Sequence, residues 1–181
     1  MDDHPSQQAL NHYFATHWQN KSRHHYRFTG PELALRVQPG ERVIDVGCGL
    51  NQFRGVIPNL VGVDPAFDQA DYRLTIEQFA REYRGPEFDV AFCLGSINFG
   101  TVDDIVRGLT SVRQVMSNHH RIYWRCNPGR HDHGLVEFEQ VPVFAWSWDW
   151  HHKLSDQLGY RLAQLEWDNH DRIFAEWITV S

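Results

Sequence analysis

The most constraining feature of the sequence is an apolar run that ends beside an aspartate and enters a glycine turn. Residues 43–49 read VIDVGCG, and a second run, VGV at residues 61–63, leads directly into Asp64. The apolar residues predict buried strands, and Gly47 and Gly49 predict a tight turn, because a Cβ would prevent the backbone from turning sharply and from lying against a ligand. We therefore expect two strands that carry acidic side chains, Asp45 and Asp64, near their carboxyl ends.

The same alternation of short apolar runs and helix-like segments continues along the chain. This pattern is typical of parallel strands joined by crossovers. The expected strands are residues 42–46, 60–63, 72–76, 88–94 and 121–126, and the expected helices are residues 77–83, 102–117 and 147–158. The chain ends in two apolar segments, residues 160–167 and 172–180, separated by a polar turn, which predicts a hairpin.

The N-terminal part has a different, helical pattern. Leu10, Tyr13, Phe14 and Trp18 recur at spacings of three and four after Ser6, which predicts an amphipathic helix. A shorter helix is expected over residues 29–37, before Pro39 and Gly40. Residues 1–181 are thus expected to form one α/β domain: an N-terminal helical cap over residues 1–38 and a Rossmann-like core over residues 39–181.

Composition indicates the size of the domain, its cellular compartment and the partners that it disfavours. The chain has 181 residues, a net charge of −6 and three cysteines without a CxxC pair. Its length suffices for one hydrophobic core, and its cysteine usage suits a reducing compartment. We find neither a membrane-spanning run nor a signal-peptide pattern, so we expect a cytoplasmic protein without membrane contact. The negative charge disfavours nucleic acid as a partner, except through a local patch.

The glycine turn and Asp64 together predict a site for an adenosine-containing cofactor. A carboxylate at the end of the second strand can accept hydrogen bonds from both ribose hydroxyls. A dinucleotide site needs a third glycine and a helix N-terminus for the pyrophosphate, whereas here Gln52 takes the place of that glycine. This favours S-adenosylmethionine, which has no phosphate, and disfavours a nicotinamide-dependent oxidoreductase.

With these motifs, the sequence resembles the class I S-adenosylmethionine-dependent methyltransferases. The similarity runs from about residue 42 to the C-terminus and rests on DVGCG, GVD, FDVAFCLGSINFG, IYWRCNPG and the final hairpin. The segments DVGCGLNQF, LGSINFG and WRCNPG are more narrowly similar to small stand-alone methyltransferases of bacteriophages, which would place the protein in a host cytoplasm. The resemblance implies a parallel sheet with helices on both faces and an antiparallel last strand.

The resemblance also implies a set of cofactor-binding residues. Asp45, Gly47, Cys48 and Gly49 would lie at the methionine end of the cofactor, and Asp64 on its ribose. Glu77 and Gln78 would lie near the adenine amine, and Leu94, Gly95 and Ser96 near the methyl sulfonium. Asn51 departs from the family pattern, which usually has a third glycine there.

The methyl acceptor is not readable from the sequence. The segment after the 88–94 strand lacks the Pro-Pro of amino-directed DNA methyltransferases, so we expect transfer to a nitrogen or oxygen of an acceptor that could be a small molecule, a nucleotide, a nucleic acid or a protein. His131 or His133 could serve as a general base, and Cys126 as the thiolate of a carbon-5 pyrimidine methylation.

Several features have both a functional and a structural interpretation. The histidine pairs fit no common zinc spacing, so we expect no metal. The tryptophan-rich residues 144–150 could stack on a planar acceptor or pack on the sheet, and the basic residues 21–27 could form a lid or a solvated linker. The alternative to an enzyme is a non-catalytic protein that keeps this fold as a binding or interaction module.

Overall fold

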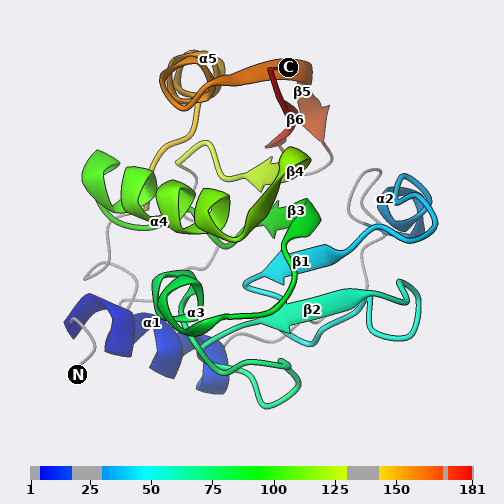
Figure 1. Cartoon of the computed structure of the whole chain (residues 1–181). Coiled ribbons are helices and arrows are strands. Elements are labelled where there is room, and N and C mark those ends of the chain that lie inside the picture. Colours follow the sequence, from blue (N-terminus) through cyan, green and yellow to red (C-terminus); the bar gives the residue numbers. More distant parts are fainter. Residues whose placement is uncertain (1–4, 18–29, 130–142, 169–170, 181) are drawn as a thin grey trace.

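The structure is a computed structural model of residues 1–181, and it describes residues 5–17, 30–129, 143–168 and 171–180. Five helices and six strands follow one another along the described chain (Figure 1). The helices are α1 (Pro5–Thr16), α2 (Pro31–Ala34), α3 (Ile76–Glu82), α4 (Val102–Gln114) and α5 (Trp148–Gln157). The strands are β1 (Val43–Val46), β2 (Leu60–Val63), β3 (Phe88–Leu94), β4 (Met116–Cys126), β5 (Tyr160–Asp168) and β6 (Arg172–Thr179).

All six strands form one sheet in the order β2-β1-β3-β4-β6-β5. The pairs β1 with β2, β1 with β3 and β3 with β4 are parallel, whereas β6 is antiparallel to both β4 and β5. This confirms the expected Rossmann-like sheet with an antiparallel hairpin at its end. The chain leaves β1 toward β2 and later returns to β3 on the other side of β1, so the sheet has its switch point at the carboxyl ends of β1 and β3, where open α/β sheets bind ligands.

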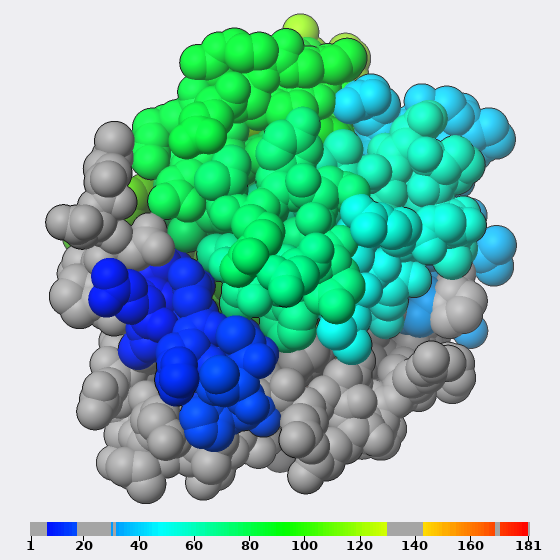
Figure 2. Space-filling model, turned by 90° about the horizontal axis from the view of Figure 1, so that it is seen from below, coloured from blue at the N-terminus to red at the C-terminus, as the bar shows by residue number. Residues whose placement is uncertain are grey.

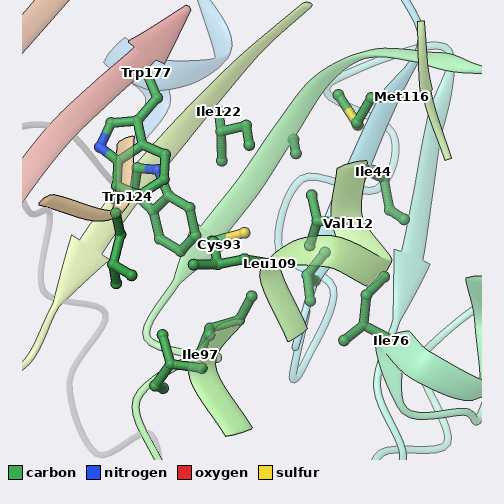
Figure 3. Packing of buried hydrophobic residues seen from close by; sticks show 14 of the residues in the cluster. Ile44, Ile76, Cys93, Ile97, Leu109, Val112, Met116, Ile122, Trp124 and Trp177 are labelled. Carbon is green, nitrogen blue, oxygen red and sulfur yellow. The ribbon is translucent and has the colours of Figure 1, made fainter. Parts of the chain in front are cut away.

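One face of the sheet is covered by α3, α4 and α5. Their buried side chains, among them Phe79, Leu109 and Leu154, pack with those of the strands in one hydrophobic cluster. Tryptophans from β4 and β6 are fully buried in this cluster, and the ring centroids of Trp124 and Trp177 are 4.9 Å apart (Figure 3). This is the larger part of the core, and burial of such aromatic side chains contributes strongly to stability.

The other face has a thinner cover. Leu33 of α2 and the loop residues Phe53 and Ile57 pack there against Phe92 and Phe174. This confirms helical cover on both faces, although α2 has only 4 residues.

Two predictions of secondary structure were wrong, one strand and the end of one helix. The expected strand at residues 72–76 is reduced to a single bridge between Val63 and Tyr72. Thr75 then caps α3 through a reciprocal capping box with Gln78, which starts the helix at Ile76 and ends any strand. The helix expected to reach residue 117 ends at Gln114, because Met116 already pairs with Phe88 in the sheet.

The remaining expected elements were confirmed, although the helix expected at residues 29–37 is shortened to α2 and the strand expected from residue 121 begins at Met116. The helix expected at residues 147–158 is α5, with Ser147 as its N-cap, and the C-terminal hairpin is β5 and β6. No helix among the described residues is long and apolar enough to cross a membrane. The basic segment at residues 21–27 lies outside the described residues.

Helix α1 lies off the carboxyl ends of the strands, on the same side as α3 (Figure 1). The ring of Phe14 in α1 contacts that of Phe99 in the loop after β3, with ring centroids 6.0 Å apart. On the molecular surface, α1 lies against the segment that contains α3 (Figure 2). The N-terminal helix thus contacts the loop after β3, next to the edge of the sheet at which the sequence predicts the cofactor.

Candidate cofactor site

The glycine turn after β1 is bonded to the end of β2. The backbone N–H groups of Gly47 and Cys48 both donate to the carbonyl oxygen of Val63, at 2.7 and 3.2 Å. The next N–H group, that of Gly49, donates to the Asp64 carboxylate at 3.0 Å. Three successive donors of the turn are therefore already used within the protein.

Gly47 occupies a position in the turn that requires glycine. Its φ is +68°, and a Cβ there would lie 2.4 Å from the Cβ of Ser96. The turn after β1 and the loop after β3 therefore touch at the switch point of the sheet. Since a larger residue would separate them, the requirement for glycine comes from both its conformation and this close approach.

Asn51 takes the conformation that a third glycine would provide. Its φ is +52°, in the left-handed region that asparagine adopts more readily than most residues. The side chain is buried, and its amide nitrogen donates to the carbonyl oxygen of Gln69 at 3.1 Å. Asn51 therefore tolerates the positive φ of this loop and fixes the loop through its side chain.

Asp64 lies where the sequence places it, directly after β2. Its side chain is buried, and its second carboxylate oxygen accepts a hydrogen bond from the N–H of Ala66 at 2.8 Å. Each oxygen thus holds one backbone donor and keeps acceptor capacity for another. The two backbone bonds fix the carboxylate beside the glycine turn, and its expected contact with a ribose stays a prediction.

Asp45 is more unusual. It is only 4% exposed, and among the described residues no hydrogen bond or ion pair of its carboxyl group occurs. Burial, together with the neighbouring charge of Asp64, raises the pKa of Asp45 to about 7. A buried carboxyl group without a donor is costly, so the structure holds an uncompensated acidic group at the end of β1.

The loop after β3 supplies a second unsatisfied group. Leu94 ends the strand, Gly95 has a φ of +103°, and Ser96 lies over Gly47. The Ser96 hydroxyl oxygen is buried and has no hydrogen-bond partner. The predicted residues Gly47 and Ser96 thus meet at the switch point, two residues after Asp45, and the described residues supply no hydrogen-bond partner to the Ser96 hydroxyl or to the Asp45 carboxyl group.

The residues predicted to lie near adenine begin α3. The Gln78 side-chain oxygen accepts a hydrogen bond from the N–H of Thr75 at 2.9 Å, as part of the capping box. The Glu77 side chain reaches toward α4, where its carboxylate oxygen is 3.7 Å from the position of a Cβ on Gly108. Their expected contacts with the adenine amine stay a prediction.

Two asparagines at this edge were not among the predicted site residues. The side-chain oxygen of Asn98, in the loop after β3, accepts a hydrogen bond from the backbone N–H of Asn127, just beyond β4, at 3.2 Å. Both side chains are buried. They lie in the motifs INFG and NPG, and a polar residue after each of two parallel strands is the signal that could have paired them.

The loop after β3 is held further by the segment before α5. The indole N–H of Trp146 donates to the carbonyl oxygen of Ile97 at 2.8 Å, and Trp146 is buried in the core. This supports the structural interpretation of the tryptophan-rich segment for Trp146, while Trp148 is 42% exposed.

The cysteines are poor nucleophiles. Burial raises the pKa of the Cys48, Cys93 and Cys126 thiols, so all three stay protonated near neutral pH. This argues against the thiolate role considered for Cys126. The candidate bases His131 and His133 lie outside the described residues. No group of three or more metal-ligating side chains occurs in the part of the chain that the structure describes.

The arrangement discriminates between cofactor classes. A pyrophosphate is held by free backbone N–H groups and a helix N-terminus, but the N–H groups of residues 47–49 are engaged and no helix occurs in the fully described loop between β1 and β2. The carboxyl groups of Asp45 and Asp64 would also repel phosphate. The site instead suits a ligand with a diol and a positive charge.

Comparison with solved structures identifies the fold. The N-methyltransferase NodS of Bradyrhizobium japonicum, solved with S-adenosyl-L-homocysteine, has a TM-score of 0.68 at 11% identity and matches 97% of this chain and 99% of its own. The magnesium protoporphyrin IX methyltransferase of Synechocystis, solved with bound S-adenosylmethionine, has a TM-score of 0.65 at 11% identity and matches 99% of this chain and 100% of its own. The chain has the class I methyltransferase fold.

This fold does not by itself decide the activity. Among the similar structures is the cyclase SpnF, with a TM-score of 0.61 at 12% identity over 82% of this chain and 79% of its own. The sequence matches no protein-family model and no curated protein. Function on this class I methyltransferase fold must therefore be argued from the site.

Proposed function

We propose that the protein is an S-adenosylmethionine-dependent methyltransferase that acts on a nitrogen or oxygen acceptor. The observation that carries this proposal is the pair of buried carboxyl groups, Asp45 and Asp64, on either side of a glycine turn whose backbone donors are already used. A cofactor with a ribose diol, a positive charge and no phosphate satisfies all three features. The bound cofactors of the similar structures, S-adenosylmethionine and S-adenosylhomocysteine, support the same choice.

The residues present fit this cofactor in several places. The open acceptor positions of Asp64 suit the two ribose hydroxyls, since each carboxylate oxygen holds only one backbone donor. The Asp45 carboxyl group suits the polar methionine end, which would also pass the turn at Gly47, and the unpartnered hydroxyl of Ser96 suits the surroundings of the methyl sulfonium. Cys48 and Gly49 would complete the methionine end, Leu94 and Gly95 would lie with Ser96 near the sulfonium, and Glu77 and Gln78 would line the adenine.

The bound cofactor supplies an electrophilic methyl group, which a nucleophile attacks in line with the departing sulfur. The protein then mainly has to orient the acceptor and exclude water. The loop after β3, fixed by the Asn98–Asn127 hydrogen bond and covered by α1 through Phe14 and Phe99, forms the described part of this acceptor side. His131 and His133 remain candidates for the base.

The acceptor class follows in part from charge. The net charge of −6 disfavours a nucleic acid, and the similar structures named above include enzymes whose names give small-molecule acceptors, such as magnesium protoporphyrin IX. We therefore propose a small molecule as acceptor. The narrower similarity to bacteriophage methyltransferases and the cytoplasmic location also belong to this proposal, and none of the similar structures named here is described as a phage protein.

The alternative is a non-catalytic protein with this fold. Its specific prediction is that the carboxyl edge binds no adenosine compound. The two buried carboxyl groups beside the glycine turn disfavour it, because placing like charges close together in a buried position is costly unless a ligand compensates them.

Isothermal titration calorimetry with S-adenosylmethionine tests the proposal. We expect binding by the wild-type protein and a loss of at least about tenfold in affinity for Asp64→Ala, because hydrogen bonds to a charged group contribute about 1.5–3 kcal/mol. Asp64→Asn, which keeps one carbonyl oxygen, should lie between the two. Asp103→Asn, an exposed change in the first turn of α4, is the matched control. Equal binding by wild type and Asp64→Ala contradicts the site, and no binding by any variant favours the alternative.

A further inference from the structure

Strand β5 forms an open edge of the sheet. It stands last in the order β2-β1-β3-β4-β6-β5, and in the part of the chain that the structure describes it pairs only with β6. It lies at the end of the molecule away from β2 and α1 (Figure 1). Arg161, Ala163 and Trp167 are exposed along it, and residues 160–168 contain neither lysine nor proline, which protect many edge strands from pairing. The outer backbone groups of this strand can therefore pair with another strand.

A bulge divides β5 into two halves. The register with β6 shifts between Leu162 and Gln164, so Ala163 is an extra residue in β5. Successive side chains of a strand point to opposite faces, and an extra residue reverses this alternation. Leu162 and Leu165 consequently lie on the same face of the sheet, and both pack against the hydrophobic cluster that α3, α4 and α5 cover.

Each half also carries one charged residue on the opposite face. Arg161 precedes Leu162, and Glu166 follows Leu165. Glu166 pairs with Phe174 of β6, whose side chain belongs to the cluster on the thinly covered face. The two halves therefore show the same pattern in reverse order, with a positive charge before the bulge and a negative charge after it.

This pattern makes the strand complementary to itself. We propose that β5 pairs antiparallel with β5 of a second copy of this chain, about a twofold axis at the bulge. Arg161 then lies opposite Glu166 of the second copy, and Leu162 lies opposite Leu165 of the second copy. Opposite charges directly across an antiparallel pair are stabilising, whereas like charges are destabilising. A twofold contact uses the same surface in both copies, so a self-complementary strand suits a second copy of the chain.

The neighbouring side chains fit this arrangement. Trp167 is 56% exposed and lies on the same face as Leu165, two residues farther along the strand. In the proposed register it lies opposite Tyr160 of the second copy, so the pairing covers part of an exposed indole. The Glu166 carboxylate accepts a hydrogen bond from Gln164 of its own strand, which holds it on its face of the sheet.

The pairing joins two sheets into one and leaves the cofactor edge free. In the sheet, β6, β4 and β3 separate β5 from β1, so the glycine turn lies far from the paired strands. The dimer therefore does not depend on the proposed function. A contact through one edge strand is small, which suits a weak dimer with a dissociation constant in the micromolar range.

Sedimentation equilibrium of the wild-type protein in reducing buffer, from low micromolar to submillimolar concentration, measures the association. We expect a reversible dimer. Arg161→Glu and Glu166→Arg each turn two attractive charge pairs into two repulsive pairs, so the dissociation constant of each variant should rise by about tenfold or more. Arg81→Glu, a charge reversal at an exposed position of α3, is the matched control and should dimerise like the wild type.

Mixing the two variants tests the register itself. In a mixed dimer each copy presents the charges that the other requires, so an equimolar mixture should dimerise within about threefold of the wild type. Recovery in the mixture also shows that both variants are folded. A measurement on the wild type alone complements this test: hydrogen exchange at the backbone amides of β5 should slow as the protein concentration rises.

The outcomes separate the dimer from the proposed function. A wild-type protein that stays monomeric over the whole range, or β5 amides whose exchange does not depend on concentration, overturns the inference. A dimer that both charge reversals leave unchanged, or a mixture of folded variants that stays monomeric, overturns it as well. Calorimetry with S-adenosylmethionine is a separate measurement, in which Arg161→Glu should bind like the wild type, so loss of the dimer leaves the methyltransferase proposal intact.

Discussion

Replacing Asp45 by asparagine should stabilise the protein at neutral and higher pH. In the folded protein, burial and Asp64 raise the pKa of Asp45 from 3.8 to about 7. Each tenfold change in an ionisation equilibrium corresponds to about 1.4 kcal/mol, so ionising this group in the folded state costs about 4 kcal/mol relative to the unfolded chain. This is an upper limit, because local relaxation and water reduce the cost of a buried charge.

The sign of the effect follows from which state ionises first. Below the unfolded pKa, Asp45 is protonated in both states and costs nothing. As the pH rises, the unfolded chain loses its proton first, so the wild-type free energy of unfolding falls until the pH passes the folded pKa of about 7. Asparagine does not ionise in either state. Asp45→Asn should therefore match the wild type within about 1 kcal/mol near pH 4 and exceed it by up to about 4 kcal/mol near pH 8.

Urea denaturation followed by tryptophan fluorescence measures this difference, since Trp124, Trp146 and Trp177 are buried in the core. The comparison of two proteins at each pH removes the contribution of most other titrating groups. A variant that is less stable than the wild type near pH 8, or a difference that does not vary with pH, would refute the reasoning. An aspartate that lowers stability in this way is expected where a site is built for ligand binding.

Two further substitutions test the turn. Gly47→Ala should lower the free energy of unfolding by about 1–3 kcal/mol more than Gly55→Ala, as measured by urea denaturation. Both glycines have positive φ, but of the two only Gly47 has a neighbour, Ser96, where the new Cβ would lie. Equal losses of stability would show that this close approach has no energetic effect. Asn51→Gly should keep the left-handed conformation and lose the hydrogen bond to Gln69, at a cost of about 1 kcal/mol in stability. Asn51→Val should cost more, because a β-branched residue disfavours positive φ. Thermal unfolding of the two variants at the same midpoint temperature would contradict this prediction.

The fold was predictable where local pattern and tertiary role agree. The VIDVGCG segment has an apolar run and then glycines, and both its strand and its turn formed as expected. The predicted elements differed from the structure where one sequence pattern was compatible with both a strand and a helix. Tyr72, Leu74 and Ile76 alternate as in a strand, but the capping box of Thr75 and Gln78 starts a helix there. Met116 continues the helical spacing of α4, yet its pairing with Phe88 places it in β4.

The sequence predicts which residues lie at the site, but it does not predict the hydrogen bonds that they form. The sequence places Asp45 and Asp64 at neighbouring strand ends, because parallel strands share their carboxyl edge. It does not show that Asp64 receives two backbone donors and Asp45 none, since these bonds depend on how the turn bends toward Val63. The Asn98–Asn127 hydrogen bond joins two loops 29 residues apart, and only the folded sheet brings them together.

A crystal structure of the protein with S-adenosylhomocysteine is the most direct test of the central claim. The account predicts both ribose hydroxyls within hydrogen-bond distance of the Asp64 carboxylate, the amino acid end of the ligand beside Asp45 and its sulfur near Ser96. A ligand bound elsewhere, or an Asp64 side chain turned away from the ribose, would contradict it.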